Sequence, residues 1–281
     1  MSAAKRAIVA LAGRLGCFPL GLAVQRLVFG RRFVRVLNYH STLADTAAAF
    51  EEQLVFFKRH FAPAGPDDLD ACIDGRFSGD RPGLLLTFDD GYRSNYDVAA
   101  PILERHGFRG FFFVPAGHIA VDRAAADKAF ATGPSEPEAR MTWAECRDLE
   151  ARGHRIGCHT RTHVRLSDEL SPERLFDEIS KAGHDIAARL GHSVEDFCWV
   201  GGEEWSYGAG AFAEIGRAGY RRVFMTNLYP VLPGSSPIWI QRTNVESFWP
   251  LGDVKFYLSG IMDIAYAGKR RRLAQKLLGQ P

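Results

Sequence analysis

The sequence has little of what marks a disulfide scaffold or a nucleic-acid-binding protein. It has five cysteines in 281 residues, irregularly spaced and with no Cys-x-x-Cys pair, which argues against a disulfide framework. The net charge is only +2, so the chain as a whole presents no field of one sign, and no nucleic-acid partner is expected. With 46% apolar and 24% charged residues, the composition is that of an ordinary globular domain.

Long uninterrupted apolar runs are also missing. Residues 7–30 are mostly apolar, but Arg14 and Arg26 interrupt them, so neither a transmembrane span nor a cleaved signal peptide is predicted. Residues 1–32 are instead predicted to form a basic, amphipathic segment, and residues 261–281 a basic C-terminal tail of the same character. These ends either pack as solvated helices or bring peripheral membrane association. Together they favour a cytoplasmic protein at the membrane surface.

Between these ends, short apolar strands alternate with helical patterns of ten to twenty residues. This alternation predicts a parallel sheet made of βαβ units. No linker or repeat divides residues 33–260, which are therefore expected to form one α/β domain of barrel type. The predicted strands are residues 33–40, 83–88, 110–115, 154–159, 194–200, 222–225 and 238–245.

Ionisable side chains follow several of these strands directly. His40, Asp89, Asp90 and His159 each stand where a predicted strand ends. In α/β barrels the reactive groups gather at the carboxyl ends of the strands, so these four side chains are expected at one centre. Two adjacent carboxylates at the edge of a core must be paired, hydrogen-bonded or bound to a metal ion.

The residue types at this centre suit a divalent metal ion. His159 and His163 would face one ion if their loop is helical, and one carboxylate could complete the set. Imidazole and carboxylate ligands favour zinc, although nickel, cobalt or iron fits as well. Such an ion lowers the pKa of bound water to roughly 7, so a second, free carboxylate could take the proton. Alone, an Asp-Asp pair or a His-x-x-x-His pair is more often structural; together, each after a strand, they predict a hydrolytic metal site.

Two motifs carry a resemblance to a known family. The stretches Thr87–Tyr92 (TFDDGY) and His159–His163 (HTRTH), in this order, resemble the first two motifs of the polysaccharide deacetylases, the metal-dependent N-deacetylases of carbohydrate esterase family four. The resemblance covers roughly residues 33–245. It implies a distorted (β/α) barrel with about seven parallel strands.

The resemblance also implies a role for each matching residue. Asp89 is the general base, Asp90, His159 and His163 are the metal ligands, and Thr160 orients the loop through a hydrogen bond. The implied reaction is attack of water on the acetamide carbonyl of an N-acetylated saccharide, either a polysaccharide or a lipid-linked sugar. The products are a free amine and acetate.

The chain departs from the family pattern at two positions: the arginine that usually braces the base and the histidine that usually serves as general acid. The arginine that braces the base is absent from the third motif, and Cys198 stands in its place. The histidine that serves as general acid is absent from the late strand. His40 is the best substitute, with a buried structural histidine as the competing interpretation, while His118 and His154 are weaker candidates.

The loop after the strand at 194–200 supplies the expected substrate contacts. The backbone N–H of Gly201 is predicted to stabilise the oxyanion. Glu203, Glu204 and Trp205 are predicted at the mouth of the cleft, against the alternative of a solvated acidic loop.

Two other functions remain open at this point. The altered third motif and the missing acid fit a catalytically weakened carbohydrate-binding protein of the same fold. The metal centre also fits an amidase or deformylase acting on a related amide.

Overall fold

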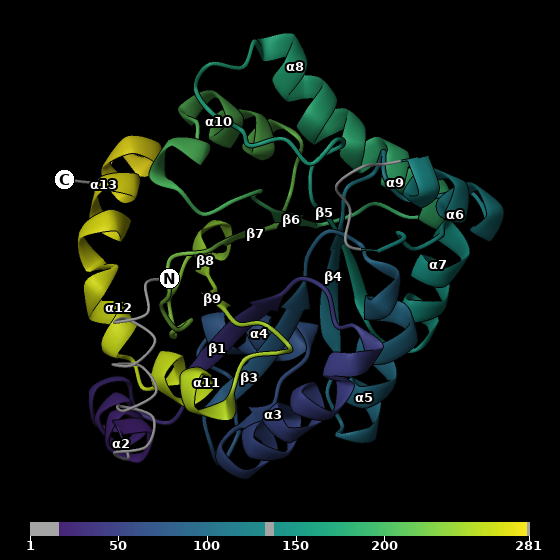
Figure 1. Cartoon of the computed structure of the whole chain (residues 1–281). Helices are drawn as coiled ribbons and strands as arrows, with labels where there is room; N and C mark the ends of the chain where they lie inside the picture. Colours follow the sequence, from purple (N-terminus) through teal and green to yellow (C-terminus); the bar gives the residue numbers. More distant parts are fainter. Residues whose placement is uncertain (1–16, 133–137, 280–281) are drawn as a thin grey trace.

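The barrel sheet is parallel throughout and nearly closed (Figure 1). The computed structural model describes residues 17–132 and 138–279. Its strands run in the order β8-β7-β6-β5-β4-β3-β1-β9, with β2 beside β3. The predicted distorted (β/α) barrel is confirmed, with eight strands in the main path. The strands are β1 (Val34–Tyr39), β2 (Ala62–Pro63), β3 (Gly83–Phe88), β4 (Gly110–Val114), β5 (Arg155–Cys158), β6 (Asp196–Cys198), β7 (Arg222–Met225), β8 (Ile240–Gln241) and β9 (Thr243–Asn244).

Helices surround this sheet, and local sequence signals account for several of their ends. Thr142 accepts a hydrogen bond from the Glu145 N–H and forms a capping box at the start of α7. The connection between β4 and α7 contains α6. The helices are α2 (Cys17–Phe29), α3 (Ala47–His60), α4 (Pro66–Ile73), α5 (Ala100–Arg105), α6 (Arg123–Thr132), α7 (Trp143–Ala151), α8 (Pro172–Phe176), α9 (Ala182–Leu190), α10 (Ala209–Arg217), α11 (Leu251–Leu258), α12 (Ile261–Ala265) and α13 (Ala267–Leu278).

Two helical stretches of the barrel wall contain a π-helical turn. The turn η2 (Asn95–Ala99) precedes α5, just before Pro101, whose missing N–H cannot continue a regular helical hydrogen-bond pattern. The turn η3 (Asp177–Lys181) lies between α8 and α9 and joins them into one helical stretch. Single π turns inside helices are frequent at functional sites, and η3 proves to support the active-site loop.

The barrel closes through one short segment, residues 240–244. β8 pairs with β7, whereas β9 pairs with β1, so the two ends of the sheet are joined through the residue between β8 and β9. That residue is Arg242, whose backbone N–H donates to the carbonyl of Met225 at 2.7 Å. The predicted strand 238–245 is therefore two short strands on either side of a buried arginine.

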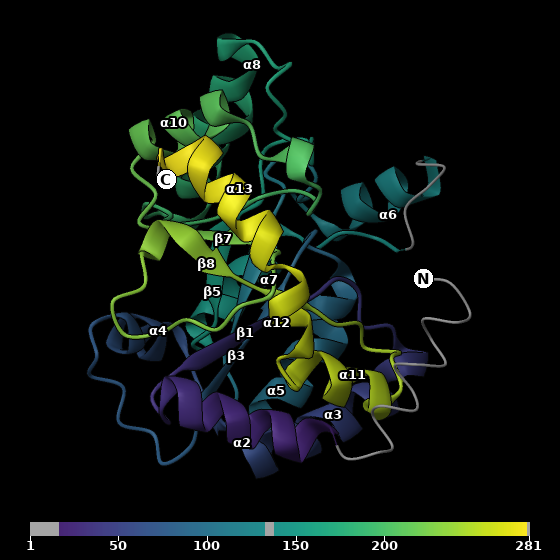
Figure 2. The same ribbon diagram turned by 90° about the vertical axis from the view of Figure 1, so that its left-hand side faces the viewer.

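The two terminal segments pack on the outside of the barrel. Pro19 lies in the first turn of α2, where a missing N–H costs no helical hydrogen bond, so it does not break this helix. α2 packs against α11, and α12 and α13 follow it on the same side of the molecule (Figure 2). The first half of the predicted segment 1–32 lies outside the described residues. Within residues 17–132 and 138–279, the helices are too short or too polar to cross a membrane.

Candidate active site

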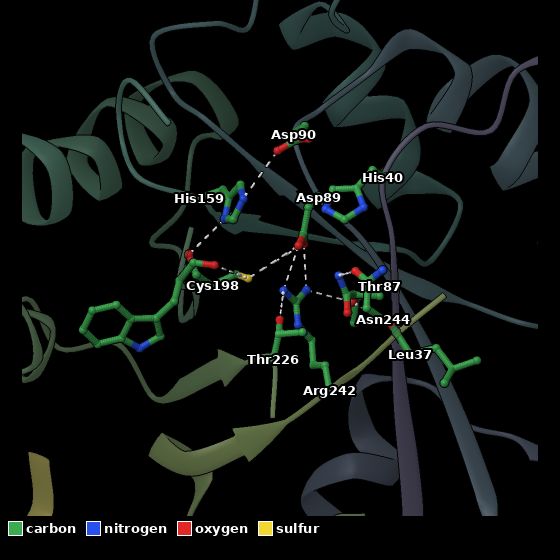
Figure 3. Close-up of polar contacts among 12 residues, drawn as sticks. Leu37, His40, Thr87, Asp89, Asp90, His159, Cys198, Thr226, Arg242 and Asn244 are labelled. Carbon is green, nitrogen blue, oxygen red and sulfur yellow. Dashed lines mark hydrogen bonds and ion pairs between the residues drawn. The ribbon is translucent and has the colours of Figure 1, made fainter. Parts of the chain in front are cut away.

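The two adjacent carboxylates diverge because the chain turns sharply after β3. Asp90 has φ 72° and Gly91 has φ 66°, both in the left-handed region. Arg140 holds this turn by donating a hydrogen bond to the carbonyl of Asp90. As a result Asp89 points toward Arg242, while Asp90 points toward His159 (Figure 3). A left-handed non-glycine residue costs of order 1–3 kcal/mol, and such strain is typically found at functional sites.

The histidine loop reaches the same centre from β5, but it is not helical as the His-x-x-x-His spacing had suggested. Thr160 and His163 have φ 66° and 56°, so the loop turns through left-handed residues. The two imidazole rings nevertheless lie with their centroids 5.2 Å apart. His159 Nδ1 lies 3.0 Å from the carbonyl oxygen of Cys198, which leaves Nε2 facing the centre. Such an outer contact fixes the ring orientation of a metal-binding histidine.

Glu178, in the π turn η3, fixes the backbone of this loop. Its buried carboxylate accepts hydrogen bonds from the N–H groups of Arg161 and Thr162 at 3.0 and 2.8 Å, and from the Thr162 hydroxyl at 2.6 Å. The hydrogen bond expected from the Thr160 hydroxyl is not present, because that oxygen is buried without a partner. Thr160 instead contributes its carbonyl, which accepts from the Ala116 N–H at 3.0 Å. Sequence reasoning missed Glu178, since nothing in its local sequence marks it.

Asp90, His159 and His163 form a set of ligand atoms suited to a metal ion. Asp90 Oδ1 lies 2.8 Å from His163 Nε2 and 3.5 Å from His159 Nε2, and the three side chains offer ligand atoms within 4.8 Å of one another. Asp90 Oδ1 is buried and has no hydrogen-bond partner. Burial alone would raise the pKa of Asp90, but the two imidazoles hold it well below its usual range. A buried carboxylate oxygen facing two imidazole nitrogens fits a divalent cation with an open coordination position.

A second set of ligand atoms, from Asp89, His159 and Cys198, also lies within 4.8 Å. It suits a metal ion less well. Both oxygens of Asp89 already accept from Arg242, and burial raises the pKa of the Cys198 thiol well above its usual value. Only the thiolate form of cysteine is a good metal ligand, so the set around Asp90 is the better candidate.

Arg242 supplies the brace that the third motif lacks. Its Nη1 and Nη2 atoms donate to Asp89 Oδ1 and Oδ2, both at 2.7 Å, and Nη1 also donates to the Thr87 hydroxyl at 2.9 Å (Figure 3). Burial alone would raise the pKa of Asp89, but the charges of Arg242 and His159 outweigh it and lower that pKa. Asp89 is therefore ionised at neutral pH. A charged residue within a predicted buried strand needs a buried partner of opposite charge. The position of Arg242 in the predicted strand 238–245 could therefore have indicated such a partner.

His40 lies on the other side of Asp89, at the end of β1. Its Nδ1 is 2.8 Å from Glu246 Oε1, and its side chain is 39% exposed, open to the cavity. Burial alone would lower the pKa of His40, but the hydrogen bond to Glu246 and the surrounding carboxylates raise it to about 9. Asn244 also donates to Glu246 Oε1, at 3.2 Å. Sequence reasoning selected His40 but missed Glu246, which lies just after the last strand.

These side chains open into one cavity of about 290 Å³. It is lined by Asn38, His40, Asp89, Asp90, His159, His163, Arg165, Val200, Gly201, Gly202, Thr226 and Asn244. The structure thus brings together every residue predicted as catalytic or metal-binding, together with Gly201. It does not bring His118 or His154 there; His154 lies against Glu104 at 2.9 Å instead.

The other predicted substrate contacts lie outside this lining. Glu203 pairs with Arg165 at the rim, with Arg165 Nε 3.2 Å from Glu203 Oε2. Glu204 pairs with Arg272 of α13 at 2.8 Å. Trp205 is 57% exposed and lies beneath the Arg165 guanidinium, 5.7 Å from the ring centroid. Arg165, which sequence reasoning missed, is thus the residue of this rim that reaches the cavity.

Solved structures of similar fold come from several bacteria. IcaB from Ammonifex degensii is 20% identical over 82% of this chain and 97% of its own, with a TM-score of 0.64. A de-N-acetylase from Aggregatibacter actinomycetemcomitans is 18% identical over 80% and 100% of the two chains, with a TM-score of 0.63. The deacetylase PplD from Streptococcus pyogenes is 18% identical over 76% and 92%, with a TM-score of 0.61. At these identities the likeness establishes the fold. None of the curated proteins compared with this chain matches it.

An α/β barrel with carboxylates and imidazoles gathered at the carboxyl ends of its strands is the architecture of an enzyme. The polysaccharide deacetylase family model matches residues 78–223, just over half of the chain. The chain belongs to the polysaccharide deacetylase family, as its two motifs predicted. It is a hydrolase of the carbohydrate N-deacetylase class.

Proposed function

We propose that this protein is a metal-dependent hydrolase that removes an N-acetyl group from a saccharide. The observation that supports this proposal is that the two adjacent carboxylates have different partners. Both oxygens of Asp89 accept from Arg242, which holds this carboxylate ionised, whereas Asp90 Oδ1 faces two imidazole nitrogens with no hydrogen-bond partner. One carboxylate is therefore available as a base, and the other as a ligand.

Asp89, His40 and Gly201 would handle the protons and the developing charge. Two lone-pair sites of the Asp89 carboxylate are taken by Arg242, and a carboxylate has about four, so it can still accept the proton of a water molecule. His40, protonated by virtue of its raised pKa, would donate to the leaving amine. The Gly201 N–H at the cavity wall would stabilise the oxyanion.

Asp90, His159 and His163 would hold the metal ion, with zinc the first candidate by ligand type and nickel, cobalt and iron the others. A divalent ion bound there supplies Lewis acidity, which polarises the carbonyl and acidifies water. Arg165 and the two asparagines Asn38 and Asn244 line the remaining wall with hydrogen-bonding groups. Such groups suit the hydroxyls of a sugar.

Metal-loaded protein is expected to release acetate from an N-acetylglucosamine oligomer or from an N-acetylated glycolipid. The chelated protein should lose this activity, and restoring zinc should recover it, because the Asp90 cluster needs a cation to polarise the amide. Acetate release, followed by mass spectrometry of the product amine, measures this directly. Formate release would identify a deformylase, and cleavage of non-sugar amides alone would identify an amidase. Saccharide binding with no release from any substrate would point to a weakened binding protein.

The pH profile should report on His40. Because the general acid must be protonated and its pKa is raised to about 9, activity should fall as pH rises through that region. Glu246→Gln removes the carboxylate that raises this pKa, so its alkaline limb should move toward the ordinary histidine value near 6.5. His40→Ala should lower turnover while leaving the metal content unchanged. An alkaline limb unaffected by Glu246→Gln, together with normal turnover of His40→Ala, would remove His40 from the mechanism.

A cytoplasmic location at the membrane surface is also proposed from the basic ends of the chain.

A further inference from the structure

The helix α2 is apolar on the face that it turns to solvent. Leu20, Val24, Leu27 and Val28 lie at spacings of four, seven and eight residues, so they form one stripe. All four are exposed, Leu27 to 85%. The opposite face of α2 is also largely apolar and is already buried in the domain. A helix that is apolar on both faces needs a second apolar or interfacial environment.

The exposed stripe continues onto α12. Ile261 and Ile264 are exposed there, Ile264 to 79%. A groove of about 350 Å³ between the two helices is walled by Val24 and Val28 on one side and by Ile264 and Ala267 on the other. Leu20, Val24, Leu27, Val28, Ile261 and Ile264 are called the α2–α12 surface below. Figure 2 shows α2, α12 and α13 together on the side of the molecule that faces the viewer.

This surface is held rigidly against the barrel. Arg35 of β1 is fully buried; its Nη1 donates to Asp263 Oδ1 of α12 at 2.9 Å, and its Nε donates to Gln25 Oε1 of α2 at 3.0 Å. Gln25 in turn donates to the carbonyl of Leu258 at 3.0 Å. The exposed side chains therefore project from helices that are fixed in place by a buried charge network.

The chain segments that carry this surface are rich in basic residues, and Asp263, which lines the groove, is paired with the buried Arg35. The first 44 residues contain seven Lys or Arg and no Asp or Glu, and residues 264–281 contain five and none. The rest of the chain carries ten more negative than positive charges, so the small net charge of the protein conceals a strong separation. Arg31 and Arg32, just after α2, and Arg271 and Arg272 of α13 are exposed.

We infer that the α2–α12 surface docks onto the surface of a lipid bilayer containing anionic headgroups. Exposed apolar side chains on a helix, accompanied by basic residues, are typical of segments that lie in the membrane interface. Each Lys or Arg close to an anionic leaflet adds roughly 1 kcal/mol of attraction. The excess of basic residues at both ends of the chain, against an acidic remainder, complements an anionic lipid surface and favours lipid over a protein partner.

The basic helix α13 links this surface to the active site. Lys269 donates to the carbonyl of Gly202, which lines the catalytic cavity, and Arg270 donates to the carbonyls of Asn227 and Leu228 at 3.0 and 2.7 Å. A protein docked in this way would work beside lipid, which favours a lipid-linked saccharide as substrate. This consequence rests on the proposed function, whereas the docking itself does not.

Co-sedimentation of the full-length protein with vesicles tests the docking without any enzymatic readout. The protein should bind vesicles of phosphatidylglycerol and phosphatidylcholine in equal parts, and bind vesicles of phosphatidylcholine alone much more weakly. Raising the ionic strength should weaken the binding. The double variant Leu27→Asp, Ile264→Asp should bind at least about tenfold more weakly, since it removes two large apolar contacts and adds two repelled charges.

The matched control is Val121→Asp with Phe176→Asp. Both residues are exposed apolar side chains on other elements, and the net charge changes by the same amount. This control should bind like the unaltered protein. Equal binding of the two double variants, or no binding by the unaltered protein, would overturn the inference. Self-association that the α2–α12 variant abolishes, without lipid binding, would also overturn it and identify a second copy of this chain as the occupant. Normal acetate release by a protein that does not bind vesicles would refute the docking and leave the proposed function unaffected.

Discussion

Arg242→Ala is expected to lower deacetylation by on the order of a hundredfold or more and to destabilise the fold by about 3–5 kcal/mol. The two effects have one cause. Arg242 is fully buried, and both of its terminal nitrogens donate to Asp89 at 2.7 Å. Its removal leaves a buried carboxylate without a counter-charge. The pKa of Asp89 should then rise, so that less of the base is ionised at neutral pH.

The pH dependence of stability gives an independent measure of the same pair. In the unaltered protein the pKa of Asp89 is lower than in the unfolded chain, so the pair stabilises the fold above a pH of about 4, and this contribution is lost as pH falls. Arg242→Ala should remove this gain, and because burial then raises the pKa of Asp89, the contribution of this residue should instead fall as pH rises. Thermal unfolding measured across the acidic range, together with acetate release, separates the effect on the fold from the effect on the base.

Two control variants test whether the loss arises from the unpaired charge. Arg242→Met combined with Asp89→Asn removes both charges, and the double variant should recover most of the stability but none of the activity. Arg242→Lys keeps the charge but loses the bidentate hydrogen bonding to Asp89. Its stability and its activity should therefore lie between those of the alanine variant and the unaltered protein. Full activity of Arg242→Ala would show that Asp89 needs no brace and is not the base.

The same substitution at the two adjacent aspartates is expected to give two different results. Asp89→Asn should lower turnover by roughly a thousandfold while the protein retains its metal ion, because it removes the base and leaves the ligand set intact. Asp90→Asn should lower both turnover and metal content, because it removes the carboxylate ligand. Elemental analysis after gel filtration and acetate release measure the two quantities on the same samples.

Each aspartate variant serves as the control for the other, because the two changes are identical and only one residue apart. Since Asp89→Asn leaves Arg242 without its counter-charge, thermal unfolding should accompany the assays. If Asp89→Asn lost the metal ion and Asp90→Asn kept it, the assignment would be reversed, and the second set of ligand atoms, with His159 and Cys198, would be the metal site.

The sequence predicted those parts of the fold and site whose signals are local. Gly83–Phe88 and Arg222–Met225 are apolar runs between turns, and both strands were predicted with their observed ends. Asp89, Asp90 and His159 follow strands, and in a parallel barrel the carboxyl ends of strands meet at one edge, so their convergence needed no knowledge of the packing. Residue chemistry then predicted a metal site.

Partners from distant parts of the chain could not be predicted in this way. Arg242 is 153 residues from Asp89, and Glu178 reaches the histidine loop from a π turn in a helix that reads as continuous. Glu246 reaches His40 across 206 residues. Each contact depends on which elements become neighbours when the barrel closes, and no local pattern encodes that choice. The predicted roles of Glu203, Glu204 and Trp205 rested on nearness in sequence, and the structure places these residues outside the lining of the cavity.

The sequence by itself thus determined the parallel barrel, the adjacent carboxylates and the two imidazoles, because strand pattern and residue type act locally. Tertiary structure alone decided the partners of each carboxylate, because only closure of the sheet through residues 240–244 brings the Arg242 charge to Asp89 and leaves Asp90 to the imidazoles. It also decided that the apolar stripe of α2 remains outside the core. A helix has two faces, and the packing against α11 covers only one of them.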